Sequence, residues 1–139
     1  MKNNLQPEVW GPSGWNFIHY VALGYPDNPS EDDKLHYKSF YESLGHVLPC
    51  QGCATHYKDT VSQFPLTQSL ESRDDLLRWT FDIHNLVNAR LEKPQLSYED
   101  ALQLYTHKQF PVMNILWKLI VLLVLAILIY VVATRKSTI

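Results

Sequence analysis

Cysteine, glycine and basic side chains are all scarce in this sequence of 139 residues. It has two cysteines and five glycines. Two cysteines are too few for a secreted scaffold held by several disulfides, and too few for a four-cysteine zinc site. No glycine-rich loop precedes a helical pattern, which excludes the P-loop and the Rossmann fingerprint. Residues 1–111 carry nine Lys or Arg against 14 Asp or Glu, a net charge of −5. Such an acidic body lacks the basic patch that nucleic-acid binding requires.

The C-terminal region differs from the body in charge and hydropathy. Residues 112–139 carry three basic and no acidic side chains, and residues 115–133 are apolar apart from Lys118. A helix of this length extends about 28 Å, close to the thickness of the hydrocarbon layer of a membrane. We therefore expect a single-pass membrane anchor over 112–134 and a short basic tail over 135–139. A buried core helix is the alternative, but the body is too small to surround one. The N-terminal residues contain no apolar signal segment, so we expect a cytosolic body.

The pattern of residues 1–111 predicts one all-α domain. It shows no sustained alternation of period two, whereas capping residues and prolines bound several helical stretches. Ser30 and Ser72 are the predicted N-caps, and Asp75 is the expected capping partner of Ser72. The expected architecture is a four-helix bundle with a short fifth helix. The expected helices are 12–24, 30–48, 50–63, 72–93 and 97–107.

Cys50-Gln-Gly-Cys53 is the strongest local motif. Its spacing allows a small disulfide, and a helix beginning at Cys50 would stabilise the thiolate through its unpaired N–H groups. A thioredoxin-like site requires a βαβ context, which is absent. A zinc site could recruit His56, but its fourth ligand would have to come from a distant histidine. We favour a redox-active disulfide within a helical bundle, with the zinc site as the alternative.

A second group of functional candidates lies on the predicted helix 72–93. One interpretation of His84 is a hydrogen-bonded core histidine, and one of Asn88 is a capping residue. Together, beside an aromatic side chain, they also suit the wall of a pocket for a flat heteroaromatic ligand. Trp15 and His19 could line the opposite wall, although Trp15 taken alone is more often a core residue. The positions that share this face of the helix, at spacings of four and three, are Leu77, Phe81, His84, Asn88 and Leu91.

Taken together and in this order, the motifs resemble the Erv/ALR family of FAD-linked sulfhydryl oxidases, especially the short members encoded by large DNA viruses. The resemblance covers about residues 5–108. It implies a four-helix bundle with a short fifth helix, FAD at the mouth of the bundle, and a homodimer. The segments that carry it are Trp10-Gly-Pro-Ser-Gly-Trp15 with His19, Tyr25-Pro26, Leu48-Pro49-Cys50-Gln-Gly-Cys53 with His56-Tyr57, and His84-Asn85-Leu-Val-Asn88 with Lys93-Pro94.

The resemblance also implies site residues, and it implies no metal. Cys50 and Cys53 would form the active disulfide, with Cys53 against the flavin ring and Cys50 facing the incoming thiol. Tyr105 falls where the family often has an aromatic residue. The residues implied to contact FAD are Gly11, Trp15, His19, Phe81, His84, Asn85, Val87, Asn88, Leu91, Lys93 and Tyr105.

The expected activity is oxidation of two thiols to a disulfide, with electrons passing through FAD to oxygen and giving hydrogen peroxide. The expected substrate is a protein thiol or a small relay protein with a dithiol. The chain lacks the shuttle disulfide and the structural cysteine pair of many relatives, so substrate would reach Cys50 directly. Because the cytosol keeps thiols reduced, a dedicated viral pathway would account for such an enzyme. The alternatives are a membrane-anchored metal-binding or adaptor module, and a thiol–disulfide isomerase, both without flavin.

Overall fold

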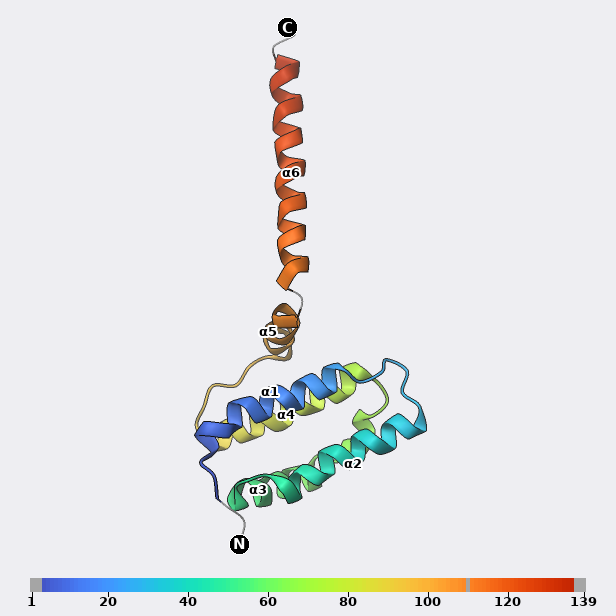
Figure 1. Ribbon diagram of the computed structural model, residues 1–139, viewed down its shortest axis with the longest axis vertical. Helices are drawn as coiled ribbons and strands as arrows, with labels where there is room; N and C mark the ends of the chain where they lie inside the picture. Colours follow the sequence, from blue (N-terminus) through green and yellow to red (C-terminus); the bar gives the residue numbers. More distant parts are fainter. Residues whose placement is uncertain (1–3, 110, 137–139) are drawn as a thin grey trace. The chain divides into compact units, whose positions relative to one another are not determined.

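The protein, described from a computed structural model, forms helices and no strands over the residues that the structure describes. These are residues 4–109 and 111–136, with side chains for 4–106 and 115–130. The predicted all-α class is therefore confirmed. The chain divides into two compact units, Met1–Ala101 and Leu102–Ile139. The elements, labelled in Figure 1, are α1 (Pro7–Leu23), α2 (Glu31–Val47), α3 (Gln51–Gln63), the 3-10 helix η1 (Leu66–Ser69), α4 (Arg73–Arg90), α5 (Tyr98–Gln109) and α6 (Pro111–Lys136).

Helices α1 to α4 make up most of the first unit. Helix α1 packs against α4, α2 packs against α3, and α3 also contacts α4 (Figure 1). The predicted four-helix arrangement is present, together with η1, which was not predicted. The side chain of Leu66 in η1 is almost completely buried, and this burial fixes the short helix against α4. The largest fully buried side chains are Tyr25, Tyr41, Leu66, Leu76, Leu77, Ile83, His19 and Thr80.

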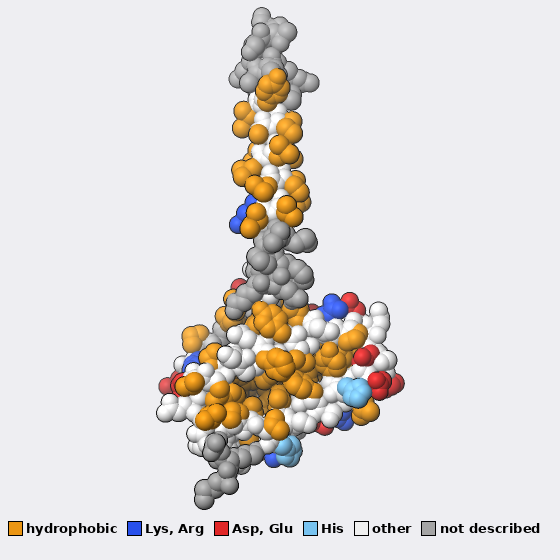
Figure 2. Space-filling model, in the orientation of Figure 1, with side chains coloured by type: hydrophobic (Ala, Val, Ile, Leu, Met, Phe, Trp, Pro, Cys, Tyr) orange, Lys and Arg blue, Asp and Glu red, His pale blue; other side chains and the backbone are white. Residues whose placement is uncertain are grey.

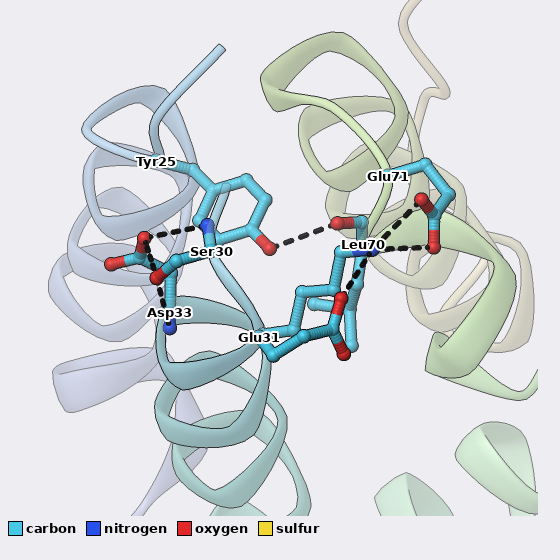
Figure 3. A network of polar contacts seen from close by, with 7 residues as sticks. Tyr25, Ser30, Glu31, Asp33, Leu70 and Glu71 are labelled. Carbon is cyan, nitrogen blue, oxygen red and sulfur yellow. Dashed lines mark hydrogen bonds and ion pairs between the residues drawn. The ribbon is translucent and has the colours of Figure 1, made fainter. Parts of the chain in front are cut away.

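Two of the helices begin at serine caps that the sequence predicts. The Ser30 hydroxyl accepts the Asp33 N–H at 3.1 Å, and the Asp33 carboxylate accepts the Ser30 N–H at 2.9 Å (Figure 3). At α4, the Ser72 hydroxyl accepts the Asp75 N–H at 3.1 Å. These bonds satisfy N–H groups that the first turn of a helix leaves without a partner. The predicted N-caps are confirmed.

Two helix boundaries differ from the prediction. Helix α1 begins at Pro7 instead of near Pro12, because a proline in the first turn loses no hydrogen bond. Helix α4 ends short of Lys93, because Glu92 adopts a φ of 54°. The chain reverses there, and the Lys93 N–H donates to the Asn88 carbonyl at 2.8 Å.

Buried tyrosine hydroxyls join the helices to one another. Tyr41 on α2 donates to the carbonyl of Ile18 on α1 at 3.0 Å. Tyr57 on α3 donates to the carbonyl of Tyr41 at 2.9 Å. Burial raises the pKa of both phenols, so they stay protonated and remain donors. These bonds fix α1, α2 and α3 relative to one another.

A polar network joins the start of α2 to the turn before α4 (Figure 3). Tyr25 donates its hydroxyl to the Leu70 carbonyl at 2.9 Å, and Lys34 Nζ pairs with Glu71 at 2.9 Å and with Glu31 at 3.2 Å. The ion pairs are partly exposed to solvent and therefore contribute little. The buried Tyr25 bond is the stronger restraint.

The expected membrane-spanning helix over 112–134 is not supported. Among the residues that the structure describes, no helix is both long enough and apolar enough to cross a membrane. The membrane anchor and the membrane partner in our expectations are corrected accordingly. The predicted domain limits at residues 111 and 134 stay predictions.

Candidate active site

The disulfide turn, defined as residues 49–53, lies where α3 begins. Cys50 is the N-cap of α3, with extended backbone angles of φ −131° and ψ 121°, and its sulfur accepts the Cys53 N–H at 3.1 Å. A disulfide joins the two cysteines, whose Cα atoms are 5.1 Å apart. Because both sulfurs are bonded to each other, neither is a thiolate ligand, and the zinc alternative with His56 gains no support.

The two cysteines differ in exposure. Cys50 is 8% exposed, whereas Cys53 is partly exposed. The N-terminal segment lies against the turn, since the Leu5 N–H donates to the Pro49 carbonyl at 2.8 Å and the Gln51 N–H donates to Asn4 Oδ1 at 3.0 Å. The cysteine expected to meet the substrate is therefore the more buried residue of the two, a feature that the sequence did not predict.

A cluster of rings, which we call the ring cluster, brings together Trp15, His19, Phe81 and His84. The Trp15 and His84 rings are stacked with centroids 4.1 Å apart and planes 8° apart. The His19 and Phe81 rings are 4.4 Å apart. The structure brings these residues of α1 and α4 together, and the two predicted walls are in direct contact; their role in holding a ligand stays a prediction.

A chain of hydrogen bonds fixes the tautomers in this cluster. The Thr80 hydroxyl donates its single proton to the Leu77 carbonyl at 2.8 Å, so it accepts the proton of His19 Nδ1, 3.0 Å away. His19 Nε2 is then an acceptor, and it receives the proton of His84 Nδ1 at 2.9 Å. His84 therefore carries its lone pair on Nε2. Thr80 was not predicted, although its spacing of four from His84 was a signal for it.

Both histidines are neutral at physiological pH. Burial, with a contribution from His84, lowers the pKa of His19 to about 3. Burial, with a contribution from the positive charge of Lys93, lowers the pKa of His84 to about 4. Desolvation disfavours the charged imidazolium in both cases. The cluster thus offers neutral stacked rings and not a positive charge.

Asn85 lies in the predicted motif but has a different partner from the one expected. Its amide donates to the Leu96 carbonyl at 2.8 Å and accepts the Leu96 N–H at 3.2 Å. Both ends of the amide therefore hold the segment after α4, which we call the strap and define as residues 91–97. The strap carries Lys93, whose charge acts on His84. Asn85 positions this segment, and direct contact with a cofactor stays a prediction.

The other predicted contacts are spread along α1, α4 and α5. A methyl group added at Gly11 would meet nothing within 4 Å, so the space beside it is open. The Asn88 carbonyl holds the start of the strap, while Val87 is half-buried and Leu91 is 52% exposed. Tyr105 lies on α5 in the second unit. Cofactor contact by these residues stays a prediction.

The residues of the first unit fit a flat heteroaromatic cofactor such as the FAD that the resemblance implies. The ring cluster supplies parallel neutral rings, and the open space at Gly11 adjoins Trp10. The indole N–H of Trp10 is buried without a hydrogen-bond partner among the described residues. A buried donor without a partner is costly unless a ligand accepts its proton. Trp10 is thus an additional candidate contact, which the sequence pattern alone did not indicate.

Comparison with known proteins agrees with this site. The model of the Erv1 / Alr family matches residues 12–111. A protein of Acanthamoeba polyphaga mimivirus, named as a probable FAD-linked sulfhydryl oxidase, is 49% identical over 100 residues, which cover 71% of this chain and 70% of the viral protein. The FAD-linked sulfhydryl oxidase of African swine fever virus (isolate Tick/Malawi/Lil 20-1/1983) is 32% identical over 96 residues, covering 69% of this chain and 79% of that protein.

A solved structure gives the same result for the fold. The crystal structure of the yeast Erv1 core aligns with a TM-score of 0.68 and 31% identity, covering 73% of this chain and 84% of that chain. Similarity of this extent, together with the match to the family over the body, confirms the resemblance seen in the sequence.

Proposed function

The chain belongs to the Erv1 / Alr family and is an FAD-linked sulfhydryl oxidase, and on this premise we propose how its residues divide the reaction. It oxidises thiols to disulfides and passes the electrons to oxygen, which gives hydrogen peroxide. The observation that carries the conclusion is the Cys50–Cys53 disulfide at the start of α3, inside the region that matches the family.

Substrate oxidation begins at the disulfide turn. A substrate thiolate attacks Cys50 Sγ, a mixed disulfide forms, and the electron pair of the broken bond leaves with Cys53 as a thiolate. A second substrate thiolate then attacks the substrate sulfur and releases Cys50. The Cys53 N–H, which lies 3.1 Å from Cys50 Sγ, stabilises the released Cys50 thiolate.

The ring cluster is assigned to the cofactor. Bound there, FAD would supply the two-electron redox chemistry that links the reduced cysteine pair to oxygen. Trp15 and His84 supply stacked faces, and His84 Nε2 supplies a hydrogen-bond acceptor whose tautomer is set by His19. Asn85 holds the strap that keeps Lys93 near His84. In this assignment Cys53 faces the cofactor and Cys50 faces the substrate.

We also propose that the enzyme is a homodimer through α1 and α2. Phe17 on α1 makes an edge contact with Phe40 on α2, with ring centroids 6.0 Å apart. Val9 and Leu35 on the same two helices are 77% and 63% exposed. Figure 2 shows hydrophobic side chains gathered over the visible face of the body. Monomeric proteins rarely expose large apolar patches. Phe17→Asp should yield a monomer in analytical ultracentrifugation.

The substrate class follows from the cysteine count. The chain has no cysteine beyond Cys50 and Cys53, so no second pair within it relays electrons from the substrate. We propose that a protein thiol or a small relay dithiol protein exchanges directly with Cys50. The viral relatives support a place in a viral pathway of disulfide formation. The cytosolic placement of the body stays a prediction.

Absorption spectroscopy of the purified full chain tests the proposed function. The expected result is a flavin spectrum with about one FAD per chain, and release of hydrogen peroxide when dithiothreitol is added. A folded, colourless protein that consumes no oxygen with dithiothreitol would contradict it.

A further inference from the structure

The backbone on either side of Cys50 is arranged like one residue of a β-strand. Cys50 has extended angles, φ −131° and ψ 121°. The Pro49 carbonyl before it and the Gln51 N–H after it both bond to the N-terminal segment, at 2.8 Å to Leu5 N and 3.0 Å to Asn4 Oδ1. A carbonyl before a residue and an N–H after it are the groups that a neighbouring strand uses to pair with that residue.

The N-terminal segment occupies this edge incompletely. Leu5 bonds through its backbone, but the acceptor for Gln51 is the side-chain oxygen of Asn4, in place of a backbone carbonyl. Leu5 is 52% exposed and Asn4 is also exposed, so little apolar burial holds the segment there. Cys50 beside it is only 8% exposed. Within the described residues, the segment therefore lies beside the Cys50 backbone through two replaceable hydrogen bonds.

We propose that this edge is the substrate-docking site, and that an extended, cysteine-bearing segment of the substrate protein displaces Asn4 and Leu5 and pairs its own backbone with Pro49 and Gln51. The inference rests on the proposed function, because it concerns the thiol that reacts with Cys50. Addition of a strand to an exposed edge is a general mode of peptide recognition, in which main-chain bonds give the affinity.

The pairing would place the two sulfurs at bonding distance. Residues directly opposite each other in such a pair, without mutual hydrogen bonds, have Cα atoms about 4.5 Å apart. Disulfides span Cα distances of about 4.4 to 6.8 Å. The substrate thiolate therefore attacks Cys50 Sγ from the opposite strand position, the new bond forms there, and the electron pair of the Cys50–Cys53 bond leaves with Cys53.

This mode of docking predicts a substrate class. Recognition by backbone groups tolerates many sequences around the cysteine, but it requires an extended or unfolded segment with a free N–H facing Pro49. Cysteines in helices are excluded because their N–H groups are already bonded. The enzyme would act on flexible cysteine-containing segments, such as the tail of a relay protein or a chain that has not yet folded.

The test follows thiol exchange at Cys50 without any flavin chemistry. In full-length Cys53→Ser, Cys50 is the single thiol. It is reacted with a short extended peptide whose cysteine carries a thionitrobenzoate leaving group, and release of the chromophore is timed. Two further peptides are N-methylated, one at the cysteine and one at the following residue. Alternate N–H groups of a strand point to opposite sides. The peptide methylated at the residue after the cysteine loses the bond to Pro49, and the peptide methylated at the cysteine is its matched control.

We expect the peptide methylated at the residue after the cysteine to react about fivefold more slowly than the unmodified peptide, and the peptide methylated at the cysteine to react at an unchanged rate. Adding Asn4→Ala and Leu5→Pro to the Cys53→Ser chain should raise the reaction rate of the unmodified peptide about fivefold. The rate of a small reagent, the thionitrobenzoate disulfide of cysteamine, should rise by less. Equal rates for all three peptides would overturn the proposal. So would an equal gain for peptide and cysteamine reagent, which would make the segment a simple cover. Dithiothreitol oxidation by the unaltered chain separately reports whether the proposed function holds.

Discussion

The ring cluster and the disulfide turn are held in place in opposite ways. In the ring cluster, His19 is completely buried and bonds to Thr80 and His84, so helices α1 and α4 fix each other. In the disulfide turn, the bonds to Pro49 and Gln51 come from an exposed N-terminal segment. The region assigned to the cofactor is thus built in advance, whereas the region assigned to the substrate is held by bonds that a ligand can replace. This difference suits an enzyme that keeps one partner through every turnover and changes the other.

The largest expected effect is a loss of activity without a loss of FAD, which distinguishes the disulfide turn from the ring cluster. Cys50→Ser and Cys53→Ser should each lower dithiol oxidation more than about 1,000-fold, because either change removes the disulfide that is exchanged. Both variants should keep FAD, since neither residue belongs to the ring cluster. Oxygen consumption and the flavin spectrum measure the two properties.

The same variants test which sulfur faces the cofactor. A thiolate left beside the flavin should give a long-wavelength absorption band. We expect this band in Cys50→Ser, where Cys53 remains, and not in Cys53→Ser. The opposite pattern would mean that the two roles are exchanged.

The next effect concerns the rigidity of the ring cluster. His19→Ala should lower the free energy of unfolding by about 2–4 kcal/mol, because it leaves a cavity and removes the buried partners of Thr80 and His84. FAD affinity should fall with it, since the His84 tautomer is no longer set. His36→Ala, at a side chain that is 72% exposed, is the control and should change neither quantity. Equal melting temperatures for the two variants would contradict a preorganised cluster.

Acid should weaken the ring cluster before it affects the carboxylates. The folded pKa of His19 is about 3 and that of His84 about 4, against 6.5 when unfolded. The unfolded chain therefore binds more protons below pH 6.5, and stability falls as pH falls from 6.5 towards 4. The slope is at most about 1.4 kcal/mol per pH unit for His19 and smaller for the less buried His84. Denaturant titrations between pH 7 and pH 5 should show this loss, and His19→Gln should flatten it.

A smaller effect is expected at the strap. Asn85→Ala removes both bonds to Leu96 and should cost about 1–2 kcal/mol. FAD should dissociate faster, because Lys93 is no longer held near His84. Asn85→Asp keeps the acceptor for the Leu96 N–H, so its stability and its rate of FAD loss should lie between those of the unaltered chain and Asn85→Ala. If flavin affinity falls whenever the Asn85 amide is changed, while hydrogen exchange in the strap stays the same, Asn85 contacts the cofactor directly.

The smallest expected effect is a gain in stability. Glu92 has a φ of 54°, a region that costs energy for residues with a Cβ atom. Glu92→Gly should raise the free energy of unfolding by about 0.5–1 kcal/mol and leave FAD binding unchanged. Calorimetry measures the shift in melting temperature. A loss of stability would show that the Glu92 side chain makes a contact that outweighs the strain.

The parts of this molecule that depend on nearby residues were the parts that sequence could predict. The caps at Ser30 and Ser72 and the position of Cys50 at the start of α3 depend on residues within four positions. The bonds between Asn85 and Leu96 could not be predicted, because an amide binds a ligand and a backbone equally well and only the fold brings Leu96 to it. The Asn4 contact at Gln51 crosses 47 positions and leaves no local pattern.

The ring cluster lies between these cases. Helical spacing placed Trp15 with His19 on one face and His84 on another, and the family resemblance joined the faces. The direct bond between the two histidines, and the tautomers that result from it, are seen only in the folded chain. The apolar run near the C-terminus was over-interpreted, because composition alone suggested a membrane span that the described helices do not support.

The tyrosine bonds between α1, α2 and α3 have a consequence for how this protein is made. Tyr41 and Tyr57 fix those three helices with hydroxyl–carbonyl bonds, which thiol reagents do not affect. With only Cys50 and Cys53 in this sequence, one intramolecular disulfide is possible, so the chain cannot form a non-native disulfide isomer within these residues. Within this sequence, formation of the Cys50–Cys53 bond therefore requires no exchange between alternative cysteine pairs, and the tyrosine bonds do not include either sulfur.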